Sequence, residues 1–379
     1  MSYRVKTGMQ PIVLLFMLVA LVAWSRTAAA FDDTALATLL EQARTEMKAP
    51  GVRAAVLYSD GRLVRSAVGV ANKKTGSPLD DDIGMPGGST GKTFVAALTM
   101  LLVEDGALAL DDPVSKYLGN EPWFRRMPGR DKVQVHHLLS HTSGVNDYPG
   151  SVRFNLSMAA RVIRHGSAKY QPEELIGYGL KRKTHFPTGE GYRYSDVGYL
   201  ILGRVIEAAT GKTYYQLLSD RILDPLQLDA IRLQNESVLT DVAMGYMAGQ
   251  PSIKKDGRMK LDPSSEWTGG GLITNPTMLV RFHDALATGN VVDPASFRLM
   301  LESGWRDPGH PEWHYGYGMF VHGSSYSHGG LWPGFRSHVL HDLDSGTTVA
   351  VQANRDGRID LRGLAWRIAA RATGLTAPD

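Results

Sequence analysis

Ser89 and Lys92 are the residues of this chain whose types and spacing are suited to nucleophilic chemistry. They are three positions apart, at the start of a nearly continuous apolar segment that predicts a helix from Thr90 to Glu104. Residues three apart on a helix share a face, so the lysine amine can approach the serine hydroxyl. Unpaired N–H groups in the first turn favour negative charge there. A serine hydroxyl needs a base to remove its proton, and a poorly solvated lysine can be that base.

A purely structural role for this pair is the alternative, because serine is a common helix cap. A second Ser-x-x-Lys, Ser252 to Lys255, lies in a polar stretch with no apolar helix behind it, and it suits the structural role better. Two other sequence motifs overlap Ser89 and Lys92, but the residues before them do not fit either motif. Gly87–Gly91 matches a nucleophile elbow and Gly91–Thr93 part of a phosphate loop, but both need a preceding buried strand, which Asp80–Gly84 cannot form.

The elements that must position these residues come from both ends of the chain. A helix is predicted over 33–47, with Asp33 as a cap candidate, and strands over 52–58 and 63–70 are joined by an Asp-Gly turn. Strand patterns return late, and strands from the two ends must pair to make one antiparallel sheet of useful size. The other predicted elements are helices 197–210, 214–222 and 360–370 and strands 315–321, 337–341 and 347–352.

Five motifs in order along the chain resemble those of the serine β-lactamase-related family, which includes class C β-lactamases, exported DD-peptidases, D-aminopeptidases and lactamase-like esterases. The resemblance extends from about Leu36 to Asn354. The motifs are Ser89-x-x-Lys92 before its apolar helix, Leu108–Val114, Leu138–Gly144, Tyr194-Ser195-Asp196, and His328-Gly329-Gly330 before Pro333-Gly334-Phe335.

This resemblance implies an α/β (α+β) fold of the β-lactamase/DD-peptidase type, with an antiparallel sheet flanked by helices and a mostly helical lobe. The expected boundaries are about 31–110 and 262–379 for the α/β lobe and about 111–261 for the helical lobe. The site is expected in the cleft between the lobes. No metal or organic cofactor is implied, and the pair His137 and His141 lacks a third ligand at a recognisable spacing.

Site roles follow from the resemblance by position. Ser89 corresponds to the acylated nucleophile, Lys92 to the amine beside it, and Tyr194 to the phenol that moves protons. His328 and Gly330 belong to the Lys/His-x-Gly strand motif. The N–H groups of Ser89 and Leu331 correspond to the oxyanion hole, whose donors typically contribute about 10²–10³-fold in rate each. From the residues alone, Tyr194 is equally consistent with core packing, since Tyr192 and Tyr199 lie close in sequence.

Asp196 departs from the family pattern, which has asparagine there. Asparagine can donate to a substrate amide oxygen, whereas an ionised aspartate can only accept, and it would hold Lys92 as a cation. We expect this change to disfavour acylamino side chains such as those of penicillins and to favour esters or simple amides. Four aromatic residues are candidates for the wall of an acyl pocket: Tyr148, Trp313, Tyr315 and Trp332.

Residues 1–30 have the layout of a cleavable secretory signal: a basic start, an apolar stretch from Pro11 to Trp24, and Ala28-Ala29-Ala30 before Phe31. An uncleaved membrane anchor is the alternative, but the apolar stretch is shorter than the roughly 20 residues of a spanning helix. We therefore expect a periplasmic or secreted protein without a stable membrane anchor. Cysteine is absent from the sequence, so no disulfide contributes to its stability.

The net charge of the sequence comes entirely from residues 1–30. This segment holds three of the 41 basic residues and none of the 38 acidic ones, so residues 31–379 carry equal numbers of both. A basic patch for nucleic acid is thus not predicted. The expected substrate is a small molecule or a peptide with an ester or amide bond. Open alternatives are a D-Ala-D-Ala carboxypeptidase, a weak β-lactamase, and a non-catalytic or very slow acyl- or penicillin-binding module.

Overall fold

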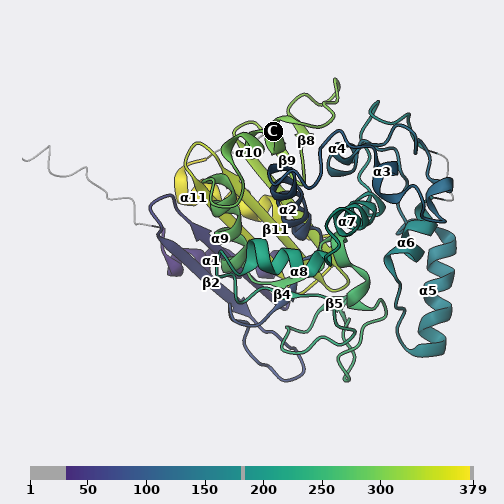
Figure 1. Ribbon diagram of the computed structural model, residues 1–379. Coiled ribbons are helices and arrows are strands. Elements are labelled where there is room, and N and C mark those ends of the chain that lie inside the picture. Colours follow the sequence, from purple (N-terminus) through teal and green to yellow (C-terminus); the bar gives the residue numbers. More distant parts are fainter. Residues whose placement is uncertain (1–30, 181–183, 376–379) are drawn as a thin grey trace, which may run out of the picture.

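The computed structural model describes residues 31–180 and 184–375, so the predicted signal lies outside the described residues. A seven-stranded antiparallel sheet, in the order β2-β1-β12-β11-β10-β9-β8, forms the centre of the fold (Figure 1). Its strands are β1 (Gly51–Leu57), β2 (Leu63–Gly69), β8 (Trp313–Tyr315), β9 (Phe320–His322), β10 (Ser325–Trp332), β11 (Phe335–Asp342) and β12 (Thr347–Ala353).

The two ends of the chain meet in this sheet, as the sequence predicted. Strand β1 pairs antiparallel with β12, with Val52 opposite Ala353 and Leu57 opposite Thr348. Asp60 and Gly61 lie in the turn between β1 and β2. The sheet is covered on both faces, which explains why nearly all residues of β1 and β12 are buried rather than alternately buried and exposed.

Helices α1 (Asp33–Glu46) and α11 (Leu361–Thr373) pack on one face of the sheet, where Leu36, Leu40 and Leu364 belong to one buried cluster with Val351. Helices α2 (Lys92–Glu104) and α9 (Pro276–Ala287) cover the other face (Figure 1). The rings of Phe94 and Phe282 stack there, 12° from parallel. The predicted first helix is confirmed, but its cap is Asp32 rather than Asp33.

Two predictions for the late strands were wrong. The segment 315–321 is not one strand; β8 and β9 are separated by a turn in which Gly318 has φ +75°. Strand β10 was not recognised by its local pattern, because Gly329 and Gly330 lower strand propensity in its middle. Gly330 is needed for a close contact with Gly87, a residue far away in the sequence. Helix α9 and helix α10 (Pro294–Glu302) were also not predicted.

A mostly helical part, between α2 and β7 (Leu272–Thr274), packs beside the sheet. Helix α7 (Asp196–Thr210) lies at its centre and ends at Gly211 in the left-handed conformation, as predicted. The predicted helix 214–222 is shorter, because α8 (Tyr214–Leu218) continues as a π-type turn. The other helices of this part are α3 (Val114–Leu118), α4 (Val135–Leu139), α5 (Val152–His165) and α6 (Pro172–Gly179), and its short strands are β4 (Arg232–Leu233), β5 (Tyr246–Met247) and β6 (Gln250–Pro251). The short strand β3 (Met85–Pro86) lies before α2 and pairs with β7.

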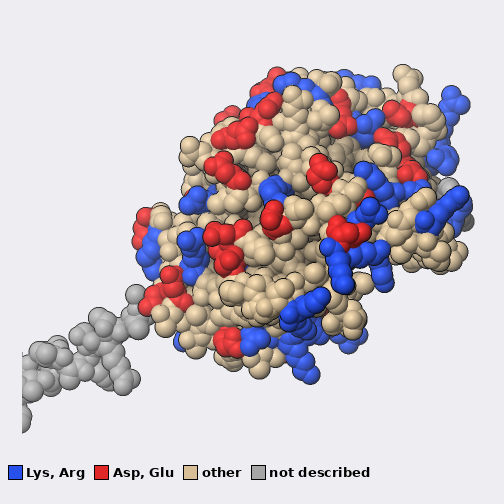
Figure 2. All heavy atoms as spheres, turned by 90° about the horizontal axis from the view of Figure 1, so that it is seen from below, with Lys and Arg blue, Asp and Glu red and all other residues tan. Residues whose placement is uncertain are grey.

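Charged side chains of both signs are interspersed over much of the face drawn in Figure 2, with basic side chains denser towards its lower right. This mixture agrees with the balanced charge of residues 31–379. Within the described ranges, none of the helices has the length and apolar character needed to cross a bilayer.

Candidate active site

Ser89 lies in a 3-10 turn (Gly88–Gly91) that leads directly into α2, so the predicted position at the start of the apolar helix is correct. The turn is pressed against β10. Gly88 has φ +57°, and a Cβ at this position would lie 2.6 Å from the backbone nitrogen of Leu331. A side chain at residue 88 would therefore clash with β10, and glycine lets the serine turn approach this strand.

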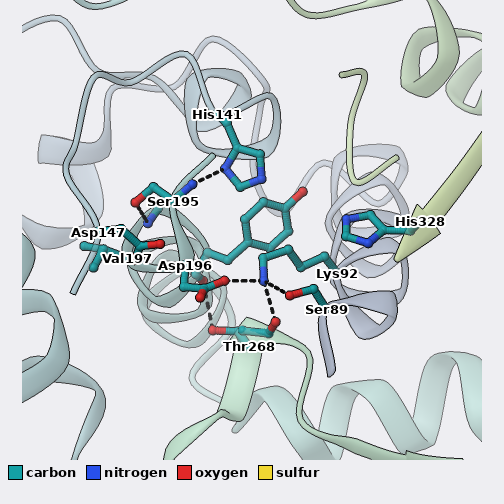
Figure 3. Close-up of polar contacts among 12 residues, drawn as sticks. Ser89, Lys92, His141, Asp147, Ser195, Asp196, Val197, Thr268 and His328 are labelled. Carbon is teal, nitrogen blue, oxygen red and sulfur yellow. Dashed lines mark hydrogen bonds and ion pairs between the residues drawn. The ribbon is translucent and has the colours of Figure 1, made fainter. Parts of the chain in front are cut away.

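Lys92 is the first residue of α2, and its side chain has no solvent exposure. Its Nζ lies 3.1 Å from Ser89 Oγ, 2.6 Å from Asp196 Oδ1 and 2.5 Å from the carbonyl oxygen of Gly269 (Figure 3). An ammonium has three N–H donors, and these three acceptors use all of them. In this arrangement Lys92 is a cation that donates to Ser89, so it must lose a proton before it can take one.

Tyr194 comes from the loop directly before α7, where Ser195 caps the helix by accepting from the Gly198 N–H at 3.2 Å. The Tyr194 hydroxyl is buried and interacts with Ser89, but it forms no hydrogen bond of normal geometry. Burial, and then the negative charge of Asp196, raises its pKa well above the usual value, while the Ser89 hydroxyl opposes that rise. Tyr194 is thus a neutral phenol, free to pair with a group arriving at Ser89.

His328 is buried on β10 and holds a defined tautomer. Its Nδ1 lies 2.7 Å from the carbonyl oxygen of Gly329 and must donate to it, so Nε2 accepts from the Tyr315 hydroxyl at 3.0 Å. Burial, followed by the positive charge of Lys92, lowers the pKa of His328 to about 3. The imidazole is therefore neutral near pH 7 and positions its neighbours rather than exchanging protons.

Gly330 and Leu331 bring the backbone of β10 against the serine turn. A Cβ on Gly330 would lie 1.9 Å from the Gly87 carbonyl oxygen and 2.2 Å from Ser337 Oγ. Ser89 and Leu331 both line one cavity. The Leu331 side chain itself is 51% exposed, so its backbone rather than its side chain suits the predicted role.

Replacing Gly330 with alanine should lower kcat/KM by about 10- to 100-fold, because the methyl group would push β10 away from the serine turn by a fraction of an ångström or more. Steady-state kinetics with a chromogenic ester measure this effect. The matched control is Gly177→Ala on α6, where an added Cβ meets open space. Equal kinetics for the two variants would show that the close approach of β10 is unimportant.

His141 was part of a recognised motif, but sequence reasoning assigned it no role. Its ring centre lies 4.2 Å from that of Tyr194, and its Nδ1 accepts from the Ser195 N–H at 3.2 Å. Burial and the charge of Lys92 hold its pKa well below the usual value. His141 thus fixes the loop that carries Tyr194, while His137 accepts from the backbone N–H of Gln134 at 3.0 Å.

Two buried acids near Lys92 were not predicted, because no local motif marks them. Asp147 accepts from the N–H groups of Tyr148 and Val197, and burial together with the Asp196 charge raises its pKa to about 7. Glu266 is only 6% exposed and accepts from Gln234 Nε2 at 2.9 Å. Burial raises the pKa of Glu266 to about 8 against the attraction of Lys92. Near pH 7, Glu266 is therefore largely protonated and Asp147 is partly protonated, so Asp196 is the acid that balances the charge of Lys92.

A cavity of about 350 Å³ opens beside Ser89. Tyr148 and Trp332 line it, whereas Tyr315 is buried against His328 and Trp313 lines a separate hollow with His322. Two of the four aromatic candidates thus line this cavity, and the other two do not. Other lining residues are Pro149, Phe154, Asp196, Met247, Leu261, Glu266, Gly269, Leu331, Pro333 and Asp356. In residues 31–180 and 184–375, no three His, Asp or Glu side chains are grouped to hold a metal ion.

Comparison with known proteins gives a consistent set of relatives. The profile of the Beta-lactamase family matches residues 36–373. A D-aminopeptidase of Brucella anthropi is 25% identical over 86% of this chain and 60% of its own length. The esterase EstB of Burkholderia gladioli is 31% identical over 53% of this chain and 54% of its own length. This chain thus spans little more than half the length of these two relatives.

Among solved structures, a D-stereospecific amidohydrolase from Streptomyces sp. superimposes with a TM-score of 0.77. It is 25% identical, and the match covers 91% of this chain and all of that one. The predicted fold class, an antiparallel sheet with flanking helices beside a helical part, is confirmed by this likeness together with the sheet described above.

Proposed function

Because this chain belongs to the β-lactamase family, a family of serine hydrolases of amide and ester bonds, we propose that it forms an acyl-enzyme on Ser89 and hydrolyses esters or simple amides. The observation that carries the proposal is the hydrogen-bonded set of Ser89, Lys92 and Asp196 beside the buried, unpartnered hydroxyl of Tyr194. This set lies at the mouth of a cavity large enough for an acyl group.

The proposed reaction has two halves. Ser89 Oγ attacks the carbonyl carbon and passes its proton to the Tyr194 oxygen as Tyr194 gives its own proton to the departing alcohol or amine, while the charge of Lys92 stabilises the negative charge that develops. The negative charge on the carbonyl oxygen is stabilised by the N–H groups of Ser89 and Leu331. In the second half, water attacks the ester carbon and passes its proton to the Tyr194 oxygen as Tyr194 gives its own proton to the departing Ser89 oxygen, which frees the acid and restores the serine hydroxyl.

Lys92 and Tyr194 have different roles in proton transfer, because their surroundings differ. Lys92 starts as a cation with all three donors engaged, so it stabilises negative charge on the Ser89 oxygen or on a Tyr194 phenolate. The Tyr194 hydroxyl interacts with Ser89 without a hydrogen bond of normal geometry, so it can take the Ser89 proton and give its own to the leaving group without first breaking such a bond. The phenol is thus the proposed direct shuttle, and the lysine makes its ionised form accessible.

The proposal is tested by incubating the protein with chromogenic esters, amino-acid amides, D-alanyl peptides and penicillins, followed by intact-mass and peptide-mass analysis. Turnover of an ester or amide, with a transient acyl adduct on the peptide that contains Ser89, supports it. A single slow stoichiometric acylation would instead favour the acyl- or penicillin-binding module. The ion pair between Asp196 and Lys92 is the feature that favours this second candidate, since it holds the lysine in its charged form.

Replacing Asp196 with asparagine should raise the rate of acylation by a penicillin relative to a simple ester by about 10-fold. Asparagine keeps an oxygen for Lys92 and adds an amide donor for the acylamino oxygen of the substrate. The rates are compared by stopped-flow or intact mass, with Asp220→Asn, an exposed aspartate near Lys212, as the control. An unchanged ratio in Asp196→Asn would contradict the proposed effect of this residue on substrate choice.

Export is also part of the proposal, because the layout of residues 1–30 is that of a cleavable signal. A periplasmic or secreted hydrolase would encounter peptides and esters outside the cytoplasm. Mass determination of the mature N-terminus after expression in an exporting host tests it, with Phe31 as the expected first residue.

A further inference from the structure

Helix α5 carries an apolar stripe on the face that points away from the core. Val152, Leu156 and Ile163 are 72%, 67% and 87% exposed, and Ala159 between them is exposed as well. Their spacing of four, three and four residues places all of them on one side of the helix. Single exposed apolar side chains are common, whereas a continuous stripe of them on one helix marks a surface that binds something.

The opposite face of α5 already has its partners. Phe154 is buried there, and Met158 and Val162 pack against the main apolar cluster. Phe154 also lines the cavity beside Ser89. Helix α5 lies at the outer edge of the molecule (Figure 1). The stripe is therefore not needed to hold the helix in place, and it faces outwards from a helix whose inner side belongs to the cavity wall.

Basic residues gather around the C-terminal end of α5. The segment 152–169 contains four basic residues and no acidic one, and the loop 254–260 contains four basic residues and one acidic residue. The loop is tied to the end of the helix, because Lys254 Nζ donates to the Gly166 carbonyl oxygen at 2.5 Å. Basic side chains are also denser towards the right in Figure 2, the side on which α5 lies in Figure 1.

Most of these positive charges are left without an acid beside them. Arg161 pairs with Glu174 at 2.5 Å, and Arg258 pairs with Asp256 at 3.6 Å. At 100° per residue, Arg153 and Arg164 lie along the same edge of the apolar stripe. Residues 31–379 are balanced in charge as a whole, but this side of the molecule is positive. Six of the basic residues are exposed and are not in those two pairs: Arg153, Arg164, Lys169, Lys254, Lys255 and Lys260.

We propose that this face of α5 docks on the anionic surface of a phospholipid membrane. The apolar stripe enters the boundary between headgroups and acyl chains, and the six exposed lysines and arginines lie against the lipid phosphates. Helix α5 has 14 residues, too few to span a bilayer, so the docking is reversible and differs from a membrane anchor. The inference goes beyond the proposed hydrolysis and does not depend on it.

A second copy of the chain is the alternative occupant, and the charges disfavour it. Helix α5 contains no acidic residue. Two α5 helices packed stripe to stripe would therefore bring the arginines at positions 153 and 164 of both copies together without a counter-charge. A helix of this length extends only about 21 Å, so two of them would bury less surface than the roughly 1,200 Å² of a stable interface. An anionic bilayer complements both the stripe and the charges.

Co-sedimentation with vesicles tests the proposal on the protein recovered from an exporting host. The vesicles contain either phosphatidylcholine alone or equal parts of phosphatidylcholine and phosphatidylglycerol. We expect binding to the anionic vesicles at low salt, and at least about 10-fold weaker binding to the neutral ones or at high salt. Leu156→Ser combined with Ile163→Ser should weaken binding about 10- to 100-fold. Leu299→Ser combined with Leu343→Ser is the control, since these leucines are 45% and 37% exposed on other elements.

A second pair of variants tests the charges. Arg164→Gln combined with Lys255→Gln should weaken binding to the anionic vesicles about 10-fold. The control is Lys48→Gln combined with Arg371→Gln, two exposed basic residues beside α1 and α11 at the other end of the molecule (Figure 1). All four variants change exposed side chains, so thermal unfolding and ester hydrolysis without vesicles should match those of the original protein.

The proposal is wrong if the protein does not bind the anionic vesicles at low salt, if the neutral vesicles bind it equally well, or if either substituted pair on this face leaves binding unchanged. A dimer in analytical ultracentrifugation that the Leu156→Ser and Ile163→Ser variant dissociates, without vesicle binding, would assign the stripe to a second copy instead. These outcomes are independent of whether Ser89 forms an acyl-enzyme, so the proposed function and the docking surface are tested separately.

Discussion

Replacing Ser89 with alanine should lower kcat/KM for a chromogenic ester by about 10⁴- to 10⁶-fold and eliminate the acyl adduct. The loss is large because the hydroxyl supplies the bond of the acyl-enzyme, and no other group at the site can replace it. Steady-state kinetics and intact mass measure both effects. The only hydrogen bond described for Ser89 Oγ is to Lys92, so thermal unfolding should show a folded variant.

The matched control is Ser252→Ala, since Ser252 and Lys255 repeat the Ser-x-x-Lys spacing. Ser252 follows β6 with no helix behind it, and its hydroxyl has no hydrogen-bond partner. Its removal should leave the kinetics unchanged. An adduct that persists in Ser89→Ala, or that is lost in Ser252→Ala, would show that the nucleophile has been assigned to the wrong serine.

Replacing Lys92 with methionine should lower kcat/KM by about 10²- to 10⁴-fold, the usual contribution of a positioned proton-transfer group. Methionine fills a similar volume, so the apolar surroundings of α2 stay packed. Because Asp196 would lose its cationic partner, the free energy of unfolding should also fall by about 1–3 kcal/mol, as measured by denaturant titration.

Lys116→Met is the control for this variant. Lys116 also pairs with an aspartate, Asp112, at 2.8 Å, but its side chain is 53% exposed. Exposed pairs of this kind contribute little to stability, so activity and stability should hardly change. If Lys92→Met retained more than a tenth of the activity, a mechanism that depends on the charge of the lysine would be untenable.

Local patterns predicted the elements with strong periodicity. The apolar residues of α1, α2 and α7 recur at helical spacing, and β1, β2 and β12 consist of β-branched or apolar runs bounded by turns. The local sequence pattern did not predict strand β10, because its glycines are needed for a contact with a residue that is distant in sequence. Gly330 must be small so that Gly87 can approach, and no residue near Gly330 in sequence indicates this requirement.

Among the charged groups of the site, too, some could be predicted from local sequence motifs and others depend on contacts between distant parts of the chain. Asp196 stood out because a family motif surrounds it, and its departure from that motif was visible in the sequence. Asp147 and Glu266 belong to no recognised motif, and their raised pKa values arise from burial and from neighbours on other elements. Such values depend on distances and desolvation, which only the packed chain defines.

The sequence by itself determined that Ser89 and Lys92 face each other, because helix geometry alone sets the relation of residues three apart. It also determined, through the order of its motifs, the family and its fold. Only the tertiary structure decided what surrounds that pair: Asp196 lies 104 positions from Lys92 and Gly269 lies 177 positions away, yet both bind the same ammonium. Contacts over such separations depend on how helices and sheet pack together, and this packing is also what excludes water from the lysine and gathers three acids around it.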